Sequence, residues 1–292
     1  MPPPVSVIVR AKDEARTIER ALASVREQTV PAELIVIDSG SSDGTVQIAR
    51  RWCDRLIEIA PEDFSYGYAL NVAAAEASAD VHAALSAHCR LPRPDWIARS
   101  LALYDRRDVA ATNGALVWPD GSPAPPGAVR YQRVEDVATD PHWGFSNHGS
   151  TWRAAAWREH PFDEELVAAE DKEWALRVLR AGWTIAFARE LWVDMSHAWR
   201  TGPAQIFRRQ RKEYRELGRF APVGAPTLRE LGSDWWHDIP RDRHSALAHR
   251  FLNWRRLTEL AGKYVGRWEA ARLTGGDAER PRLRPRDAGR RR

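Results

Sequence analysis

The sequence predicts an α/β fold with a mostly parallel central sheet flanked by helices. Over residues 1–105, short apolar runs of strand length alternate with amphipathic segments of helical length. Such alternation favours parallel strands joined by right-handed crossovers. Polar residues follow two of the runs directly, where ligands bind in open α/β sheets. Hydrophobic residues make up 43% of the 292 residues, so a sizeable core is available.

The first part of the chain supplies four predicted strands and three predicted helices. The strands are expected at 5–11, at 32–45 (which breaks at a Gly/Ser/Asp turn), at 56–60 and at 81–87. The helices are expected at 13–28, from Thr45 onward and at 68–79. In the first helix Ile18, Leu22 and Val25 recur on one face, which is the helical period.

The second part is less regular. Residues 109–127 predict a strand that runs into a Pro/Gly loop, and 119–150 are expected to be an irregular segment rich in Trp, His and Asn. A strong helix is predicted at 170–183, ended by Gly182, and short strands follow at 184–188 and 191–199. Two more helices are predicted at 203–220 and 245–268. The last helix is expected to present one face that either docks on the sheet domain or forms a surface for a membrane or a partner. This face is made of Leu247, Phe251, Trp254, Leu257, Ala261, Tyr264 and Trp268.

These patterns divide the chain into three parts. Residues 1–203 form the α/β domain, 204–275 a helical C-terminal extension, and 276–292 a basic tail that is expected to be disordered. Residues 280–292 carry seven arginines and Asp287, a net charge of +6, which leaves −2 for the rest of the chain. The tail and the basic positions Arg208, Arg209, Arg211 and Lys212 would suit peripheral contact with a membrane face, and equally a soluble protein.

Several classes are excluded or disfavoured. No apolar run is long enough to span a membrane, and the N-terminus lacks the apolar stretch of a signal peptide. Two cysteines, Cys53 and Cys89, without motif spacing favour a reducing cytoplasm. The chain has no nucleic-acid motif, no phosphate-binding P-loop, and no glycine fingerprint of dinucleotide enzymes after its first strand.

Two polar sites at strand ends carry the chemistry. Asp38 ends a buried run, so its carboxylate can either accept hydrogen bonds from a base or ribose or cap its own turn. Ser86-Ala87-His88 follow the run that starts at Val81. His88 could bind a metal or pyrophosphate, pack as a hydrogen-bonded core residue, or mark a degenerate site.

The ordered motifs resemble the family 2 glycosyltransferases. These motifs are SVIVRAKDEARTIERALASVREQ, ELIVIDSGSSDGT, FSYGYALNVAAAEA, LSAHCRLPRPDWI, and the stretch from GFSNHGSTW to EDKEWALRVLRAGW, ending near MSHAW. Several of them are similar to bacterial rhamnosyltransferase-like members. The resemblance covers roughly residues 4–200 and implies a GT-A fold, which is Rossmann-like. It also implies inverting transfer of a sugar from a nucleotide-diphosphate donor to a hydroxyl acceptor, such as a glycan, a lipid-linked glycan or a small molecule.

The resemblance assigns roles to individual positions. Ala11, Glu14, Asp38, Asn71, Ser86 and His88 are expected to surround the nucleotide sugar. Asp171, beside Glu170 at a helix start, matches the catalytic base, which the helix dipole keeps ionised. Alternatively, Glu170 and Asp171 only cap the helix. Lys172 and Glu173 are expected on the solvated face.

Two departures from the family pattern bear on the cofactor. Members usually carry Asp-x-Asp where this chain has Ser86-Ala87-His88, so His88 occupies the metal-ligand position. His197 matches a late histidine that completes the metal site or touches the pyrophosphate. Imidazole suits Mn²⁺ better than Mg²⁺, and the site could dispense with the metal if Arg10, Lys12 and Arg200 offset the diphosphate charge. The second departure is Tyr68, where relatives often carry a basic residue.

The acceptor side is expected in the loop 143–149. Trp143 and His148 could stack on a sugar ring, and Asn147 could bond its hydroxyls, although an ordinary packed loop is the alternative. Trp235, Trp236 and His237 are weaker candidates, since helix docking explains them as well. A non-catalytic protein that binds a nucleotide sugar or a glycan, with a lost metal site, is the rival function. A nucleotidyltransferase is disfavoured, because the first loop has no glycine.

Overall fold

A computed structural model of the chain describes residues 3–117, 127–137, 145–195, 202–221, 223–237 and 254–274; within these, the side chains of 235–237, 254–256 and 274 are left aside. The strands are β1 (Ser6–Ala11), β2 (Glu33–Asp38), β3 (Arg55–Glu58), β4 (Val81–Ser86), β5 (Cys89–Arg90), β6 (Val109–Asn113), β7 (Leu116–Val117), β8 (Arg130–Gln132), β9 (Gly149–Arg153), β10 (Thr184–Phe187) and β11 (Val193–Met195). The α-helices are α1 (Ile18–Arg26), α2 (Thr45–Ala49), α3 (Tyr66–Glu76), α4 (Trp96–Ala102), α5 (Val134–Val137), α6 (Ala154–Glu159), α7 (Glu170–Arg180), α8 (Pro203–Leu217), α9 (Leu228–His237) and α11 (Trp254–Thr274).

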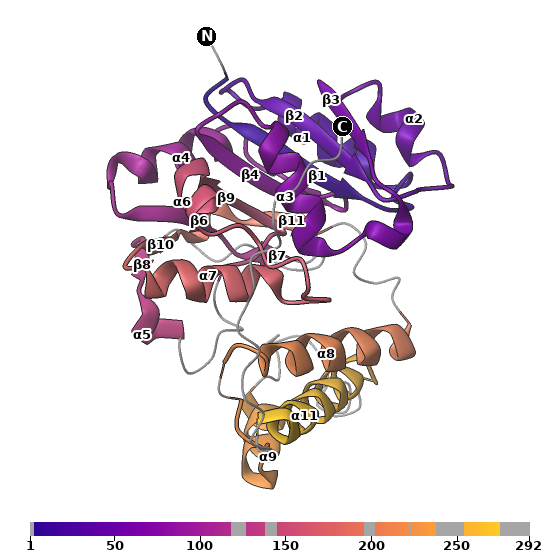
Figure 1. Cartoon of the computed structure of the whole chain (residues 1–292), viewed down its shortest axis with the longest axis vertical. Helices are drawn as coiled ribbons and strands as arrows, with labels where there is room; N and C mark the ends of the chain where they lie inside the picture. The colour runs from indigo at the N-terminus through magenta and orange to yellow at the C-terminus, as the bar shows by residue number, and fades with distance from the viewer. Residues whose placement is uncertain are drawn as a thin grey trace, which may run out of the picture.

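The main sheet has the order β3-β2-β1-β4-β9-β6-β10-β8. β1 to β4 pair in parallel, as do β6 and β10, whereas β9 is antiparallel to both its neighbours and β8 is antiparallel to β10. A small second sheet joins β5, β11 and β7. This arrangement confirms the predicted α/β fold with a mostly parallel sheet and helices at the C-terminal end (Figure 1).

Apolar residues pack on both faces of the main sheet because β1 and β2 alternate their side chains between the two sides. Val7 and Val9 pack on one face with α1 and α4, whereas Ile8 packs on the other with α3 and α7. The second face contains a cluster of rings from Phe145, Trp152, Phe162 and Trp174. Buried packing on both faces explains why these strands read as continuous apolar runs.

The segment 119–150 is less irregular than predicted. β8, α5 and the first two residues of β9 lie within it, although 118–126 and 138–144 are outside the described residues. β9 inserts between β4 and β6, and its Thr151 hydroxyl lies 2.8 Å from the hydroxyls of Ser100 and Thr112. The sequence GSTWR shows no apolar run, yet the strand is buried, and the buried Thr151 hydroxyl is satisfied by the hydroxyls of Ser100 and Thr112.

The docking alternative for the predicted face of the last helix is wrong at Leu257 and Trp268, and the alternative of a membrane or partner surface stays a prediction. Leu257 and Trp268 are 39% and 47% exposed, whereas Gly262, Gly266 and Ala270 lie against α8. A Cβ built on Gly266 would lie 2.5 Å from the Arg211 carbonyl oxygen, so only glycine allows the two backbones to approach this closely. Leu247 and Phe251 lie outside the described residues, and the Trp254 side chain is among those left aside. Among the helices that the structure describes, none is long and apolar enough to cross a bilayer.

Candidate active site

The sheet register brings the predicted strand-end residues together. Ala11 pairs with Asp38, and Arg10 pairs with Ser86, so the ends of β1, β2 and β4 meet at one edge. The loops that follow these strands contain Glu14 and His88. This is the carboxyl edge of a parallel sheet, where the sequence predicted a ligand site.

The carboxylate of Asp38 is fully engaged by its own turn. It is 1% exposed and accepts hydrogen bonds from the backbone N–H of Gly40 at 2.9 Å, the N–H of Ser41 at 2.7 Å and the Ser41 hydroxyl at 2.5 Å. Gly40 has φ +84°, and a Cβ there would lie 2.6 Å from Pro61, so the turn requires glycine. The turn-capping alternative therefore describes the contacts of Asp38 in this structure, and its contact with a nucleotide stays a prediction.

The first loop is tied to this turn by polar bonds. Lys12 donates through Nζ to the carbonyl oxygens of Ser39, at 3.1 Å, and Gly40. Asp13, with φ 52°, donates its N–H to the Ser41 hydroxyl and accepts the N–H of Ser42, both at 2.8 Å. A non-glycine residue in the left-handed region is strained, and these bonds hold it there.

His88 faces a carboxylate from the first loop. Its Nδ1 lies 3.1 Å from Glu14 Oε1, and the side chains are 22% and 17% exposed. When Nδ1 carries the proton it donates to Glu14, and Nε2 is then the nitrogen that can bind a metal or accept a proton. Glu14 also accepts a bond from the Thr17 hydroxyl at 2.7 Å. The structure thus brings Glu14 and His88 together, as the resemblance implies.

His148 lies next to this pair. Its ring centroid is 6.4 Å from that of His88, its carbonyl accepts the N–H of Ser86 at 3.1 Å, and its Nδ1 lies 2.6 Å from the Ser146 hydroxyl. Burial, with the positive charge of Arg209 next in effect, lowers the pKa of His148 to about 3. His148 is therefore neutral at physiological pH and acts as a hydrogen-bonding ring rather than as a charge.

Glu170 and Asp171 begin α7 and have different surroundings. Glu170 is 4% exposed and accepts from Arg10 Nη1 at 3.1 Å and from Asn147 Nδ2 at 3.3 Å. Burial, reinforced by the negative charge of Asp171, raises the pKa of Glu170, while Arg10 opposes the shift. Asp171 is partly exposed, and its Oδ2 accepts the backbone N–H of Asn147 at 3.2 Å. Asp171 is therefore the carboxylate of this pair that a substrate can reach.

Two features fix the start of α7. Ala169, at the N-cap, has φ 61°, so the chain enters the helix through a strained left-handed residue. Lys172 is 7% exposed and donates through Nζ to the Phe145 carbonyl at 2.7 Å. The expectation of a solvated Lys172 is wrong, because this bond ties α7 to the segment that contains Asn147. Glu173 is partly exposed and bonds to Arg177 at 2.7 Å.

Asn71 is bonded away from the strand ends. Its Nδ2 donates to the Phe162 carbonyl and to Glu164, and its Oδ1 accepts from Trp157 Nε1 and the Phe162 N–H, at 2.8 to 3.0 Å. The amide is saturated by these four bonds. In this structure Asn71 clamps the segment before α7, and its predicted contact with the nucleotide is not among its interactions.

Helix α8 was not predicted to reach the site, but it does. Tyr214 and Leu217 pack against Ala169, and Lys212 Nζ lies 5.5 Å from the centroid of the Tyr66 ring. The Tyr66 carbonyl in turn accepts from Arg10 Nη1 at 3.1 Å. Figure 1 shows α8 between α7 and α11. The basic stretch at 208–212 is visible in the sequence, but no pattern in the sequence predicts that it packs near α7.

Among the described residues, the site offers some, but not all, of the side chains that a divalent metal ion needs. His88 offers an imidazole nitrogen, with Glu14 placed to orient the ring, and both groups suit Mn²⁺. Over the residues that the structure describes, no group of three or more His, Cys, Asp or Glu side chains could hold a metal ion. His197, Arg200 and Trp143 lie outside the described residues, and the side chains of Trp235, Trp236 and His237 are not described.

The chain is similar to known proteins over most of its length. Residues 6–164 match the model of a family described as "Glycosyl transferase family 2". Glycosyltransferase AglE of Haloferax volcanii is 29% identical over 203 residues, which are 65% of this chain and 66% of that protein, just under two thirds. The O-antigen chain rhamnosyltransferase WbaN of Salmonella anatum is 29% identical over 75% of this chain and 71% of its own length. The mannosyltransferase PcManGT of Pyrobaculum calidifontis, solved with GDP-Man and Mn²⁺, superimposes with a TM-score of 0.65 at 17% identity, over 94% of this chain and 88% of its own.

Proposed function

Because the chain belongs to glycosyl transferase family 2, we propose that it moves a sugar from a nucleotide-diphosphate donor to a hydroxyl acceptor, with inversion at the anomeric carbon. Membership confirms the resemblance that the sequence motifs suggested and makes the chain an enzyme, a glycosyltransferase. The observation that carries the proposal is the unequal pair at the start of α7: a buried Glu170 and a reachable Asp171.

Asp171 acts as the general base in this proposal. The acceptor hydroxyl loses its proton to Oδ1 or Oδ2 as its oxygen attacks the anomeric carbon, and the nucleoside diphosphate leaves from the opposite side. The bond from the Asn147 N–H orients the carboxylate. Glu170 is committed to Arg10 and Asn147. One reachable carboxylate supports a single displacement, hence inversion.

The leaving diphosphate requires positive charge. PcManGT is described with Mn²⁺, and the corresponding hypothesis here is a divalent cation bound by Nε2 of His88, with Glu14 orienting the ring. Such a cation would offset the charge of the diphosphate. Without one, the exposed Lys12 of the first loop is a candidate, since its Nζ has a third N–H besides those that bond the carbonyls of Ser39 and Gly40. Arg10 bonds Glu170.

The segment around Asn147 is proposed to face the sugar. Asn147 Oδ1 is buried and has no hydrogen-bond partner among the described residues, so a hydroxyl donor at this point would satisfy it. The relative WbaN is named an O-antigen chain rhamnosyltransferase. A deoxyhexose donor and a glycan acceptor are therefore the first pair to try.

The test measures nucleoside diphosphate release from UDP-, GDP- and dTDP-sugars, with Mn²⁺, Mg²⁺ or EDTA, and the anomeric configuration of the product by NMR. Wild type is expected to release one nucleoside diphosphate and to invert the configuration. Release that requires Mn²⁺ and is lost in His88→Ala would support the cation hypothesis. Release that persists in EDTA and in His88→Ala would mean that cationic side chains offset the charge of the diphosphate. Retention of configuration, or no release with any donor, would contradict the proposal.

A further inference from the structure

A row of cationic side chains lies along one face of α8. Arg208, Arg211, Lys212 and Arg215 are spaced three and four residues apart, so they are neighbours on the helix surface. Together with Val167 and Glu216 they line a hollow of about 300 Å³. Like charges at this spacing repel one another, which an anion bound between them would relieve.

The residues that the structure describes leave most of this positive charge without an ion pair. Arg211 is paired, since its Nε lies 3.0 Å from both carboxylate oxygens of Glu269. The one carboxylate in the hollow, that of Glu216, is paired with Arg219 at 3.1 Å. For Arg208, Lys212 and Arg215 the described part of the chain supplies no ion pair.

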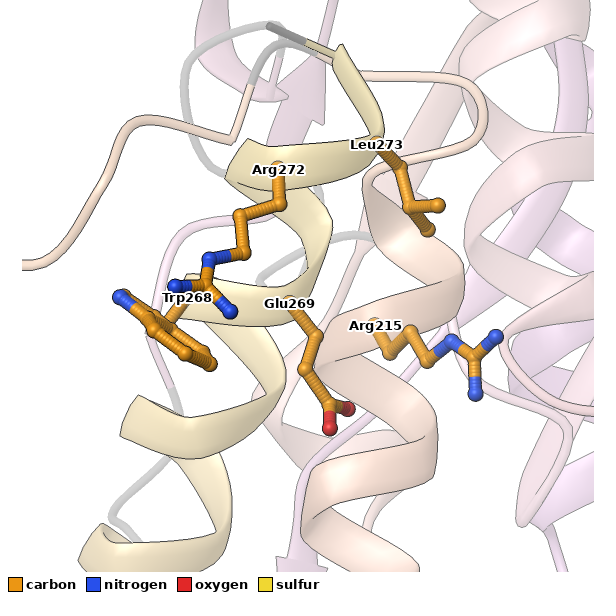
Figure 2. Close-up of a pocket in the computed structure, with 5 residues that line it drawn as sticks. All are labelled: Arg215, Trp268, Glu269, Arg272 and Leu273. Atoms are coloured by element: carbon orange, nitrogen blue, oxygen red, sulfur yellow. The ribbon is translucent and has the colours of Figure 1, made fainter. Parts of the chain in front are cut away.

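The adjoining hollow on the α8–α11 pair provides a contrast. It measures about 290 Å³ and is lined by Arg215, Trp268, Glu269, Arg272 and Leu273. Figure 2 shows the Arg272 guanidinium over the Trp268 ring, at 3.2 Å from its centroid, and the Arg215 guanidinium pointing away from Glu269. Here one carboxylate faces the cations and apolar groups fill the rest, so an anion is better bound on the α8 side.

The cationic hollow adjoins the catalytic helix. Val167 lies in the segment that leads directly into Glu170, and Lys212 covers the ring of Tyr66, whose carbonyl accepts from Arg10. Arg10 bonds Glu170. A ligand held by α8 is therefore connected by contacts to Glu170, the residue that precedes the proposed base.

We propose that this hollow binds a phosphate or pyrophosphate group of the acceptor, at a site separate from that of the donor diphosphate. The inference rests on the proposed function and narrows its acceptor to a class: hydroxyl compounds that carry a phosphate ester. One guanidinium group can bind two phosphate oxygens at once, and the hollow offers two exposed arginines, Arg208 and Arg215, for which the described residues supply no ion pair.

The test titrates inorganic pyrophosphate calorimetrically into wild type, with UDP, GDP and dTDP at saturation so that the donor site is filled. Arg208→Gln/Arg215→Gln removes two cations of the hollow without touching the base or its partners. Arg158→Gln/Arg180→Gln removes the same charge from exposed positions on α6 and α7. We expect wild type and the control to bind pyrophosphate alike and the hollow variant to bind about tenfold to hundredfold more weakly.

Donor hydrolysis in the absence of acceptor identifies the source of the anion. If the hollow variant releases nucleoside diphosphate at an unchanged rate, the hollow does not bind the donor, which supports the acceptor assignment. A lower rate would assign the hollow to the donor and overturn the inference.

Equal pyrophosphate binding by variant and wild type, or none in wild type, would also overturn the inference. So would binding to phosphatidylglycerol vesicles, lost in the variant, without pyrophosphate binding. Pyrophosphate binding without donor turnover by wild type would instead count against the proposed function alone.

Discussion

The two sides of the site satisfy their carboxylates in different ways. On the first-loop side, Asp38 bonds residues two and three positions away, and Asp43 bonds Thr45. On the α7 side, Glu170 bonds Arg10 across 160 positions, and Asp171 bonds Asn147 across 24. On the first side the bonds of Asp38 close its own turn, although Asp13 and Glu14 reach Ser42 and His88. The bonds of Glu170 to side chains of the described residues all join distant segments.

This difference indicates where the chemistry lies. A carboxylate that is saturated by its own turn holds a loop in shape, which favours a rigid wall for the nucleotide. On the α7 side, the buried Glu170 has a raised pKa and lies beside the reachable Asp171, and the nearby amide oxygen of Asn147 has no hydrogen-bond partner among the described residues. Such an arrangement is typical of a site that binds a substrate. We therefore expect substitutions of Asp171 and of the groups that orient it to reduce turnover, and substitutions in the Asp38 turn to act mainly on stability.

The largest effect is expected for Asp171→Asn, which removes the proposed base. Turnover should fall by roughly 10²- to 10⁴-fold, because an amide cannot accept the proton of the acceptor hydroxyl. The thermal midpoint should change little, since Asp171 is partly exposed. Glu173→Gln removes the same charge from the same helical turn and should keep its turnover. Steady-state release of nucleoside diphosphate measures both, and an Asp171→Asn enzyme within tenfold of wild type would assign the base elsewhere.

Arg10→Met should produce the largest loss of stability. It leaves Glu170 buried without its cation, and breaking such a pair costs about 3 kcal/mol in the free energy of unfolding. The pKa of Glu170 is already raised by burial and rises further in the variant. Between its unfolded and folded pKa values the folded state keeps a proton that the unfolded state has lost, so stability falls as pH rises.

Urea unfolding at pH 5.5 and pH 8 measures this effect. The deficit of Arg10→Met relative to wild type should be larger at pH 8. Arg50→Met breaks an exposed pair with Glu58 and should cost less than about 1 kcal/mol at either pH. A deficit for Arg10→Met that is independent of pH would mean that Glu170 stays ionised in the variant.

The contrast also separates what the sequence predicts from what it does not. Asp38 and His88 could be placed because each ends or follows an apolar run, and the register of β1, β2 and β4 then brings them to one edge. The pair Arg10–Glu170 has no local signal, since a salt bridge across 160 positions depends on the whole sheet. The expectation for Lys172 was wrong for the same reason: charged residues are usually exposed, and the Phe145 carbonyl that accepts from its buried Nζ comes from a distant segment.

Lys172→Met tests whether the α7 side depends on positioning. The change leaves the Phe145 carbonyl without its donor, which costs about 2 kcal/mol in the free energy of unfolding. Because the neighbouring Asn147 orients Asp171, kcat should fall about tenfold while KM for the donor stays unchanged. Lys172→Arg keeps a donor and should recover part of kcat. An unchanged kcat in Lys172→Met would make the residue purely structural.

The smallest effect is expected for Asp38→Asn, on the first-loop side. Asparagine keeps one oxygen for the N–H groups of Gly40 and Ser41, and its amide can donate to the Ser41 hydroxyl, so the turn should survive. The loss of charge-assisted bonds should cost about 1 kcal/mol in stability, with KM for the donor unchanged. Thermal unfolding and donor KM distinguish the two roles of this carboxylate. A tenfold rise in KM at constant stability would show that Asp38 leaves its turn to bind the nucleotide, and the two sides of the site would then differ less than their resting contacts suggest.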